Sequence, residues 1–397
     1  MISNNTFNNK QTLFAKGNKS KMQYRTFKET DEKITLFGLG TMRMPLQSDG
    51  ELDENAAIQM IRRTIDKGVN YVDTAYMYHN FKAEKAVGKA LQGGYREKVF
   101  LADKMPVWLV KTEDAMKELF YEQLENCQTD YFDFYLLHNV TKAIWKRSEK
   151  FNCLKFLQEM KDEGKIKHLG FSFHDDYDFF VEIVNSYNWD FCQIQLNFMD
   201  MNYQAGLSGL NYAASKKLPV IIMEPVKGGK LVDNLPPSIE NYWKLAPTQR
   251  KPIDWALRWV ANFDSVLTIL CGVHSEDQMI ENIEILNSSL PNSLTTEELS
   301  IVNKVSEEYN RLIKYSCTAC NYCLPCPQKI NIPTAIQLRN DVELYKNLPK
   351  TTADYKLWLG EGSRGADCTF CGKCLIKCPQ QLPIPKIMKE CSEVFGS

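Results

Sequence analysis

The sequence predicts an α/β protein, in which a (β/α)8 TIM barrel is followed by a small, mainly helical domain rich in cysteine. Three observations lead to this prediction. From about residue 34 to residue 286, short β-branched or aromatic runs alternate with helix-length amphipathic segments. Eight such pairs over about 250 residues match the size of a (β/α)8 barrel. Eight of the thirteen cysteines form two closely spaced runs, at 317–326 and 368–378.

The chain is expected to begin with a disordered extension and a hairpin. Residues 1–21 are polar and lack a periodic apolar pattern. The alternating run MQYRTF and the polar turn KETDEK then predict a short hairpin over Met22–Lys33. The predicted barrel domain covers residues 22–290.

Eight short runs predict the barrel strands. Several of them are apolar at nearly every position, as expected where both faces of a parallel sheet are buried. A doubly wound open sheet is the competing fold, but no Gly-x-Gly-x-x-Gly turn follows the first run. The predicted strands are 34–40, 69–74, 99–104, 133–138, 166–172, 191–197, 218–224 and 266–272. The clearest predicted helices between them are 55–66, 112–126, 153–163 and 276–286.

A linker separates the predicted barrel from the rest of the chain. The segment NSSLPNS (287–293) has linker composition. Thr295, followed three residues later by Glu298, predicts a capped helix start. Residues 295–397 are therefore expected to form a helical linker and a second domain.

Composition excludes several classes of partner. The chain has 397 residues and a net charge of -1, from 48 basic and 49 acidic side chains. Without a polybasic field, neither nucleic acid nor a membrane surface is an expected partner. No apolar run reaches the roughly 18–20 residues of a membrane span, and the polar start lacks the apolar centre of a secretory signal. We therefore predict a cytoplasmic protein.

Four reactive side chains stand at or just after the ends of predicted strands. Asp73 and Tyr78 follow the second strand, Lys104 ends the third and His138 ends the fourth. The C-terminal ends of barrel strands meet at one rim, so these side chains are expected to face one another. An adjacent ammonium lowers the pKa of a phenol, which makes Tyr78 a candidate proton donor beside Lys104. Asp73 would keep Lys104 protonated, and His138 would orient a carbonyl oxygen.

The segments that carry these residues resemble a known family. VDTAYMYHN (72–80), FLADK (100–104) and DFYLLH (133–138) are similar to the active-site segments of the aldo-keto reductases, which are NAD(P)H-dependent carbonyl reductases built on a (β/α)8 barrel. The resemblance runs from about Gly40 to Asn282. It implies that Tyr78 is the general acid, because Tyr78 rather than Tyr76 stands five residues after Asp73. It also implies a small-molecule carbonyl substrate, which aromatic and Met residues in the rim loops suggest is mainly apolar.

The same resemblance implies a binding site for NADP(H) or NAD(H). Ser172 and Gln193 would hold the nicotinamide carboxamide, and Met223 would cover the nicotinamide ring. The glycine-rich segment 224–231 would cover the pyrophosphate, and 271–282 would bind the adenosine end. The implied cofactor contacts are Gly40, Thr41, Met42, Asp73, Ser172, Gln193, Met223, Glu224, Val226, Gly229, Gly272, Gln278, Glu281 and Asn282.

Two departures from the family pattern affect the cofactor site. Phe173 stands where many members have Asn, and His174 follows it, so one contact is changed or relocated. Gly272 and Gln278 stand where many NADPH-preferring members have Lys and Arg. The resemblance favours NADP only slightly over NAD, because many members of the family use NADPH.

The C-terminal cysteines form two closely spaced runs, each ending in Cys-Pro. Their spacing resembles that of two-cluster ferredoxins, in which three cysteines of a run hold one [4Fe–4S] cluster and the fourth reaches the other cluster. The resemblance implies a helical, ferredoxin-like iron–sulfur domain. One cluster would be held by Cys317, Cys320, Cys323 and Cys378. The other would be held by Cys368, Cys371, Cys374 and Cys326. Zinc is the alternative, because paired Cys-x-x-Cys also binds Zn²⁺.

Three hypotheses join the two halves. Hydride transfer moves two electrons and a [4Fe–4S] cluster accepts one, yet no flavin signature is visible to couple them. We prefer an aldo-keto-type oxidoreductase whose clusters stabilise the domain or exchange electrons with a redox partner protein. The second hypothesis is an electron-transfer protein that uses the barrel as a nicotinamide-binding scaffold. The third is a redox or iron sensor.

Overall fold

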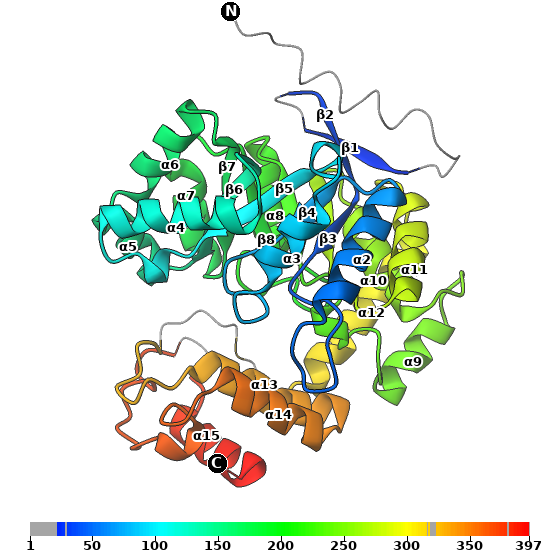
Figure 1. Cartoon of the computed structure of the whole chain (residues 1–397). Coiled ribbons are helices and arrows are strands. Elements are labelled where there is room, and N and C mark those ends of the chain that lie inside the picture. The colour runs from blue at the N-terminus through cyan, green and yellow to red at the C-terminus, as the bar shows by residue number, and fades with distance from the viewer. Residues whose placement is uncertain (1–21, 28–29, 316, 318–322, 379–380, 397) are drawn as a thin grey trace, which may run out of the picture.

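The computed structural model describes residues 22–27, 30–315, 317, 323–378 and 381–396. The predicted disordered extension, residues 1–21, and the predicted cluster ligand Cys320 lie outside the described residues. Figure 1 shows two bodies, a barrel surrounded by helices and a smaller helical domain beneath it.

Eight parallel strands close into a barrel in the order β10-β3-β4-β5-β6-β7-β8-β9. The ring closes between β10 and β3, where Ile269 pairs with Phe37. The closed barrel confirms the predicted fold. Its strands are β3 (Phe37–Gly40), β4 (Tyr71–Asp73), β5 (Phe100–Met105), β6 (Phe132–Val140), β7 (Ile166–Phe173), β8 (Phe191–Gln195), β9 (Val220–Met223) and β10 (Val266–Cys271).

The strands read as continuously apolar because each buries both faces. On β6, Phe134 and Leu136 point into the barrel interior, whereas Tyr135 and Leu137 pack against the surrounding helices. Successive side chains of a strand point to opposite faces, so the inner and outer cores draw on alternate residues. The helices that cover the outer face are α2 (Glu54–Asp66), α3 (Ala83–Ala90), α4 (Glu113–Asn126), α5 (Lys142–Lys150), α6 (Cys153–Asp162), α7 (Tyr177–Ser186), α8 (Gly206–Ser215), α9 (Pro237–Lys244), α10 (Pro252–Ala261) and α11 (Glu276–Asn287).

An antiparallel hairpin closes the N-terminal end of the barrel. It consists of β1 (Tyr24–Phe27) and β2 (Glu32–Thr35). Phe27 and Ile34 are fully buried in the inner core. The prediction of one strand over 34–40 is therefore wrong in its first part. Its first two residues pair with β1, and only the part from Phe37 onward enters the barrel.

Helix α12 (Thr296–Leu312) packs mainly against the barrel, although it also touches α13 (Ile332–Tyr345) of the second domain. Its buried side chains Val302, Val305 and Tyr309 belong to the outer core of the barrel. The predicted capping box is present, because Thr295 and Glu298 exchange side-chain-to-backbone hydrogen bonds. We therefore propose that the domain boundary lies after Leu312, rather than at residues 290–295.

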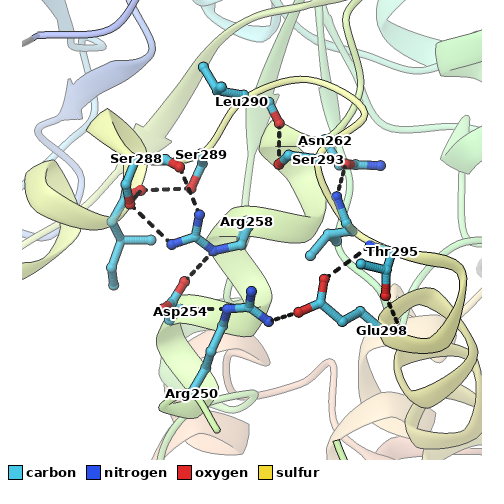
Figure 2. A network of polar contacts seen from close by, with 12 residues as sticks. Arg250, Asp254, Arg258, Asn262, Ser288, Ser289, Leu290, Ser293, Thr295 and Glu298 are labelled. Atoms are coloured by element: carbon cyan, nitrogen blue, oxygen red, sulfur yellow. Dashed lines mark hydrogen bonds and ion pairs between the residues drawn. The ribbon is translucent and has the colours of Figure 1, made fainter. Parts of the chain in front are cut away.

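A polar network fixes the linker between α11 and α12 to helix α10 (Figure 2). Arg258 of α10 donates to the carbonyl oxygen of Ser288 at 2.9 Å. Asn262, at the end of α10, accepts from the backbone of Leu294 at 3.0 Å. Arg250, just before α10, forms an ion pair with Glu298. These contacts join the linker and the start of α12 to the barrel.

The C-terminal domain contains α13 (Ile332–Tyr345), α14 (Leu348–Trp358) and α15 (Ile384–Phe395) around a core of its own. Helices α13 and α14 are separate because Lys346 takes a left-handed backbone conformation with φ 48° and ends α13. The rings of Tyr355 and Phe395 stack with centroids 4.1 Å apart. Within the described ranges, we find no helix with the length and apolar character of a membrane span.

The second domain lies at the end of the barrel opposite the β1–β2 hairpin, next to the C-terminal ends of the strands (Figure 1). Lys230, in the loop after β9, forms an ion pair with the buried Asp341 of α13. Leu344 of α13 joins the outer core of the barrel. Two contacts of different kinds therefore hold the small domain against the rim.

Candidate active site and iron–sulfur ligands

The ammonium of Lys104 connects three of the four predicted catalytic residues. Its Nζ donates to Asp73 Oδ1 at 2.5 Å and to the backbone oxygen of Thr74 at 2.6 Å. The phenol oxygen of Tyr78 lies 3.4 Å from the same Nζ. Asp73 ends β4, Lys104 stands near the end of β5, and Tyr78 belongs to the loop before α3. The barrel thus brings an acid, an amine and a phenol to one point on the rim.

Lys104 remains charged although it is completely buried. Burial alone lowers the pKa of an ammonium, but the charge and hydrogen bond of Asp73, together with the nearby Tyr78 oxygen, outweigh burial and raise the pKa of Lys104. The other oxygen of Asp73, Oδ2, is buried and has no hydrogen-bond partner among the described residues. The Asp73 carboxylate therefore serves chiefly to hold this ammonium.

The phenol of Tyr78 has a raised pKa, which corrects the expectation from the sequence. Burial raises the pKa of Tyr78, and the nearby charge of Lys104 lowers it by less. The pKa of Tyr78 rises overall, because the free-energy cost of removing a phenolate from water exceeds the stabilisation that the Lys104 ammonium provides at 3.4 Å. Tyr78 therefore keeps its proton until a reaction draws on it, and Lys104 limits the rise.

His138 presents a neutral imidazole beside the phenol. The rings of Tyr78 and His138 lie edge to face, with their centroids 6.2 Å apart. The ring centroids of Trp108 and His138 lie 5.0 Å apart. Burial, Lys104 and His174 together hold the pKa of His138 well below its usual value. Its Nδ1 is buried and has no partner within the described ranges. A neutral ring of this kind can donate a hydrogen bond to an oxygen without carrying charge.

The predicted nicotinamide contacts come together on β7, β8 and β9. Ser172 and Gln193 pair directly in the strand register. The amide of Gln193 lies 3.6 Å from the sulfur of Met223. The Oε1 of Gln193 and the Oγ1 of Thr41 are buried and lack partners in the part of the chain that is described. Two orphaned acceptors fit the amide group of a nicotinamide.

A cavity of about 400 Å³ opens next to this group, a size within the usual range for cofactor sites. A Cβ on Gly228 would lie 2.7 Å from Arg43 Nη2, and Gly228 has φ 64°, so only glycine fits this wall comfortably. Seven predicted cofactor residues line the cavity: Glu224, Val226, Gly229, Gly272, Gln278, Glu281 and Asn282. The other seven lie at the strand ends outside its lining: Gly40, Thr41, Met42, Asp73, Ser172, Gln193 and Met223.

The structure explains the departure at Phe173. This ring is buried in the outer core, with its centroid 5.1 Å from that of Phe180, so it points away from the rim. The next residue, His174, lies close enough to Glu224 and Lys104 for their charges to affect its titration. Burial is the largest influence and lowers the pKa of His174 to about 4.

Several residues that line or brace the site were not predicted. Arg43 Nη1 lies 2.8 Å from Glu224 Oε1. Lys227, inside the predicted pyrophosphate segment, lies 2.7 Å from Asp200 in the rim loop after β8. Lys350 of the second domain also lines the cavity. Lys227 is visible within the glycine-rich motif, whereas Lys350 carries no signal in the sequence because its role depends on how the domains dock.

The described cysteines of the two runs lie close together, and the crossed assignment of cluster ligands stays a prediction. One hollow in the second domain is lined by Cys323 and Cys326 of the first run and by Cys368, Cys371 and Cys374 of the second. Burial raises the pKa of the Cys374 thiol, and the neighbouring charges of Cys368, Cys371 and Cys326 add to that rise. Cys326 therefore lies beside the three cysteines of the other run.

The remaining described ligands, Cys317 and Cys378, pack against the same small core. No three described His, Cys, Asp or Glu side chains converge as they would on one metal ion. The thiols instead surround a hollow, which fits a polynuclear cluster with soft sulfur ligands better than a single Zn²⁺.

Comparison with known proteins assigns a family model to each domain. Residues 37–307 match the model described as the aldo/keto reductase family. Residues 316–382 match the model described as a 4Fe-4S dicluster domain. The first match covers more than half of the chain, and the second spans all eight cysteines of the two runs.

Individual relatives match the barrel. Methylglyoxal reductase YeaE of Escherichia coli is 30% identical over 212 residues, covering 52% of this chain and 69% of the relative. The NADH-specific methylglyoxal reductase of E. coli is 25% identical, covering 67% and 94%. The holo form of aldo-keto reductase AKR11C1 from Bacillus halodurans is 25% identical, covers 72% and 96%, and has a TM-score of 0.59. An aldo-keto reductase from Klebsiella pneumoniae in complex with NADPH is 25% identical over the same shares, with a TM-score of 0.55.

Proposed function

Because the chain belongs to the aldo/keto reductase family, we propose that it transfers hydride between NADPH or NADH and a small-molecule carbonyl compound, with Tyr78 as the proton donor. The chain is an NAD(P)-dependent oxidoreductase that also carries two [4Fe–4S] clusters. The observation that carries the proposal is the ammonium of Lys104, 2.5 Å from Asp73 and 3.4 Å from Tyr78.

Each catalytic residue has one task. The bound nicotinamide supplies the hydride. Tyr78 donates its phenolic proton to the carbonyl oxygen as negative charge develops there. Lys104 stabilises the phenolate that remains, and Asp73 fixes Lys104. Neutral His138 donates a hydrogen bond that orients the carbonyl oxygen. Run in reverse, the same groups oxidise an alcohol.

The proposed cofactor contacts divide into two sets. Ser172, Gln193 and Thr41 hold the amide of the nicotinamide, supported by the two orphaned acceptors. The cavity beside them takes the pyrophosphate and the adenosine end. The cytoplasmic location and the redox partner protein inferred from the sequence stay predictions.

The substrate class we propose is a small aldehyde or ketone of low charge. The indole of Trp108 donates to the sulfur of Met77 at 3.2 Å, and Trp108 also lies against His138, so the rim beside the proton donor is aromatic and apolar. Three relatives are named as methylglyoxal reductases. Methylglyoxal is therefore the first substrate to test, followed by apolar aldehydes of increasing size.

The test compares two phenols in the cluster-loaded protein. Tyr78→Phe removes the proposed proton donor and is expected to reduce the rate of NADPH oxidation by about 10²–10⁴-fold. Tyr76→Phe is the matched control, because Tyr76 bonds to Glu122 at 3.0 Å rather than to Lys104. Iron content and nicotinamide affinity should not change in either variant. Turnover that survives Tyr78→Phe but is lost in Cys371→Ser would instead favour an electron-transfer role.

A further inference from the structure

One side chain that lines the cavity beside the active site belongs to the iron–sulfur domain. Most of the cavity lining comes from the loop after β9, the end of β10, α10 and α11. Lys350, in the first turn of α14, lines the same cavity although it is separated from the barrel by the whole first cysteine run. The second domain therefore contributes a charged side chain to a pocket in the barrel.

Most of the basic side chains around this cavity are already paired. Arg43 lies 2.8 Å from Glu224, and Lys251 lies 2.6 Å from Glu281. His274 exchanges hydrogen bonds with the side chain of Gln278. Among the described residues, Lys350 has no carboxylate partner within ion-pair distance. Its ammonium is the cation left to meet an anion from outside the protein.

The charge balance of the cavity makes this ammonium important. Three carboxylates line the cavity, namely Glu224, Asp233 and Glu281. Arg43 and Lys251 neutralise two of them, so without Lys350 the lining would have a net negative charge. Such a lining repels a phosphate, because like charges at this range disfavour binding. Lys350 brings the balance back to neutral.

The docking of the second domain keeps Lys350 in place. Lys230, in the loop that covers the cavity, forms an ion pair with the buried Asp341 of α13. Leu344 at the end of α13 is buried in the core of the barrel. Helix α14 starts only four residues after Leu344, so its first turn cannot move far from the cavity.

We propose that Lys350 binds the 2′-phosphate of NADPH, so that the iron–sulfur domain completes the cofactor site and sets the cofactor preference. This inference rests on the proposed function. It accounts for Gly272 and Gln278, which bring no positive charge to the cavity, while the barrel's own Arg43 and Lys251 are held by carboxylates. The positive charge comes from the other domain instead.

The test is an anaerobic fluorescence titration of the cluster-loaded full chain with NADPH and with NADH. Lys350→Ala is expected to weaken NADPH binding about 5–10-fold and to leave NADH binding unchanged, since one partly exposed ion pair is lost. Lys350→Glu should weaken NADPH binding further, and Lys350→Arg should restore it. Lys356→Ala is the matched control, because Lys356 stands on the same helix but does not line the cavity.

Three results would overturn the inference. Equal weakening of NADPH and NADH binding would move Lys350 to a phosphate that both cofactors share. Identical affinities for Lys350→Ala and Lys356→Ala would remove Lys350 from the site, while leaving the proposed function intact. Failure of the unmodified protein to bind either nicotinamide would overturn both the inference and the proposed function.

Discussion

The two domains solve the problem of a stable core in different ways. The barrel buries apolar side chains in two concentric cores, one inside the strands and one between the strands and helices. The second domain has only twelve buried apolar residues in its described core. Six of its cysteines pack against that core from the edge: Cys317, Cys323, Cys326, Cys368, Cys374 and Cys378. Small domains with little apolar surface to bury usually need such covalent or metal support.

This comparison implies that the clusters are part of the fold of the second domain but not of the barrel. In the barrel, polar groups such as Lys104 are placed inside a framework that apolar packing already maintains. In the second domain, the cysteine ligands pack directly against the small apolar core. Metal binding and folding are then one equilibrium, as in other small metal-dependent domains.

The largest expected effect is therefore that of iron removal. Chelation under anaerobic, reducing conditions should unfold α13, α14 and α15 while the barrel remains folded. Amide hydrogen exchange should rise throughout 332–395 and stay slow in the barrel strands. Cys371→Ser should reproduce the loss of one cluster. Cys391→Ser is the control, because Cys391 is buried in the same core but belongs to neither run. Slow amide hydrogen exchange in α13 after iron removal would show that the second domain folds without its clusters.

The next effect is the removal of the buried ammonium. Lys104→Met leaves Asp73 buried without its ion-pair partner, and should cost about 3–5 kcal/mol of barrel stability and abolish turnover. The iron content should not change. Lys89→Met removes an exposed ion pair with Glu54 and should cost less than about 1 kcal/mol. Urea unfolding followed by tryptophan fluorescence measures both variants. Comparable losses would mean that burial does not govern the cost.

The third effect is a pH dependence confined to the barrel. Burial, and then the charge of Glu84, raise the pKa of Asp103 well above its usual value. The unfolded chain releases this proton near pH 4 and the folded chain keeps it to higher pH. The folded state therefore binds more protons, and the free energy of unfolding should fall as pH rises above about 4, through the raised pKa. Asp103→Asn should flatten this slope, while the exposed Asp66→Asn should leave it unchanged. An unchanged slope in Asp103→Asn would show that other groups control it.

The smallest effect concerns the helix that lies between the domains. Thr295→Ala removes the N-cap of α12 and should cost about 1 kcal/mol in unfolding of the barrel, without releasing iron. Thr295→Ser should restore most of it, and the exposed neighbour Thr296→Ala should have little effect. Iron release in Thr295→Ala would place α12 with the second domain after all.

Much of the fold and of the active site was predictable from the sequence. The C-terminal ends of barrel strands lie at one rim in every such barrel, so the sequence predicts that Asp73, Tyr78 and Lys104 lie close together. The division of the run 34–40 was not predictable, because Ile34 and Phe37 are both apolar and periodicity does not reveal which strand each will pair with.

Neither the direction of the Tyr78 pKa shift nor the docking of the second domain could be predicted from the sequence. The pKa of Tyr78 rises because burial outweighs Lys104, and the depth of burial follows from packing around the rim. The position of Lys350 depends on a contact between Lys230 and Asp341, which lie more than a hundred residues apart. Neither the depth of a side chain nor a contact between domains leaves a local pattern.

The β1–β2 hairpin completes a barrel interior that is solid. Phe27 and Ile34 pack with Phe134 and other inward-facing side chains, so no passage runs through the ring of strands. Small molecules therefore enter and leave only at the rim. When two molecules bind there one above the other, the deeper one can leave only after the upper one, which links the rate of a catalytic cycle to the order of release.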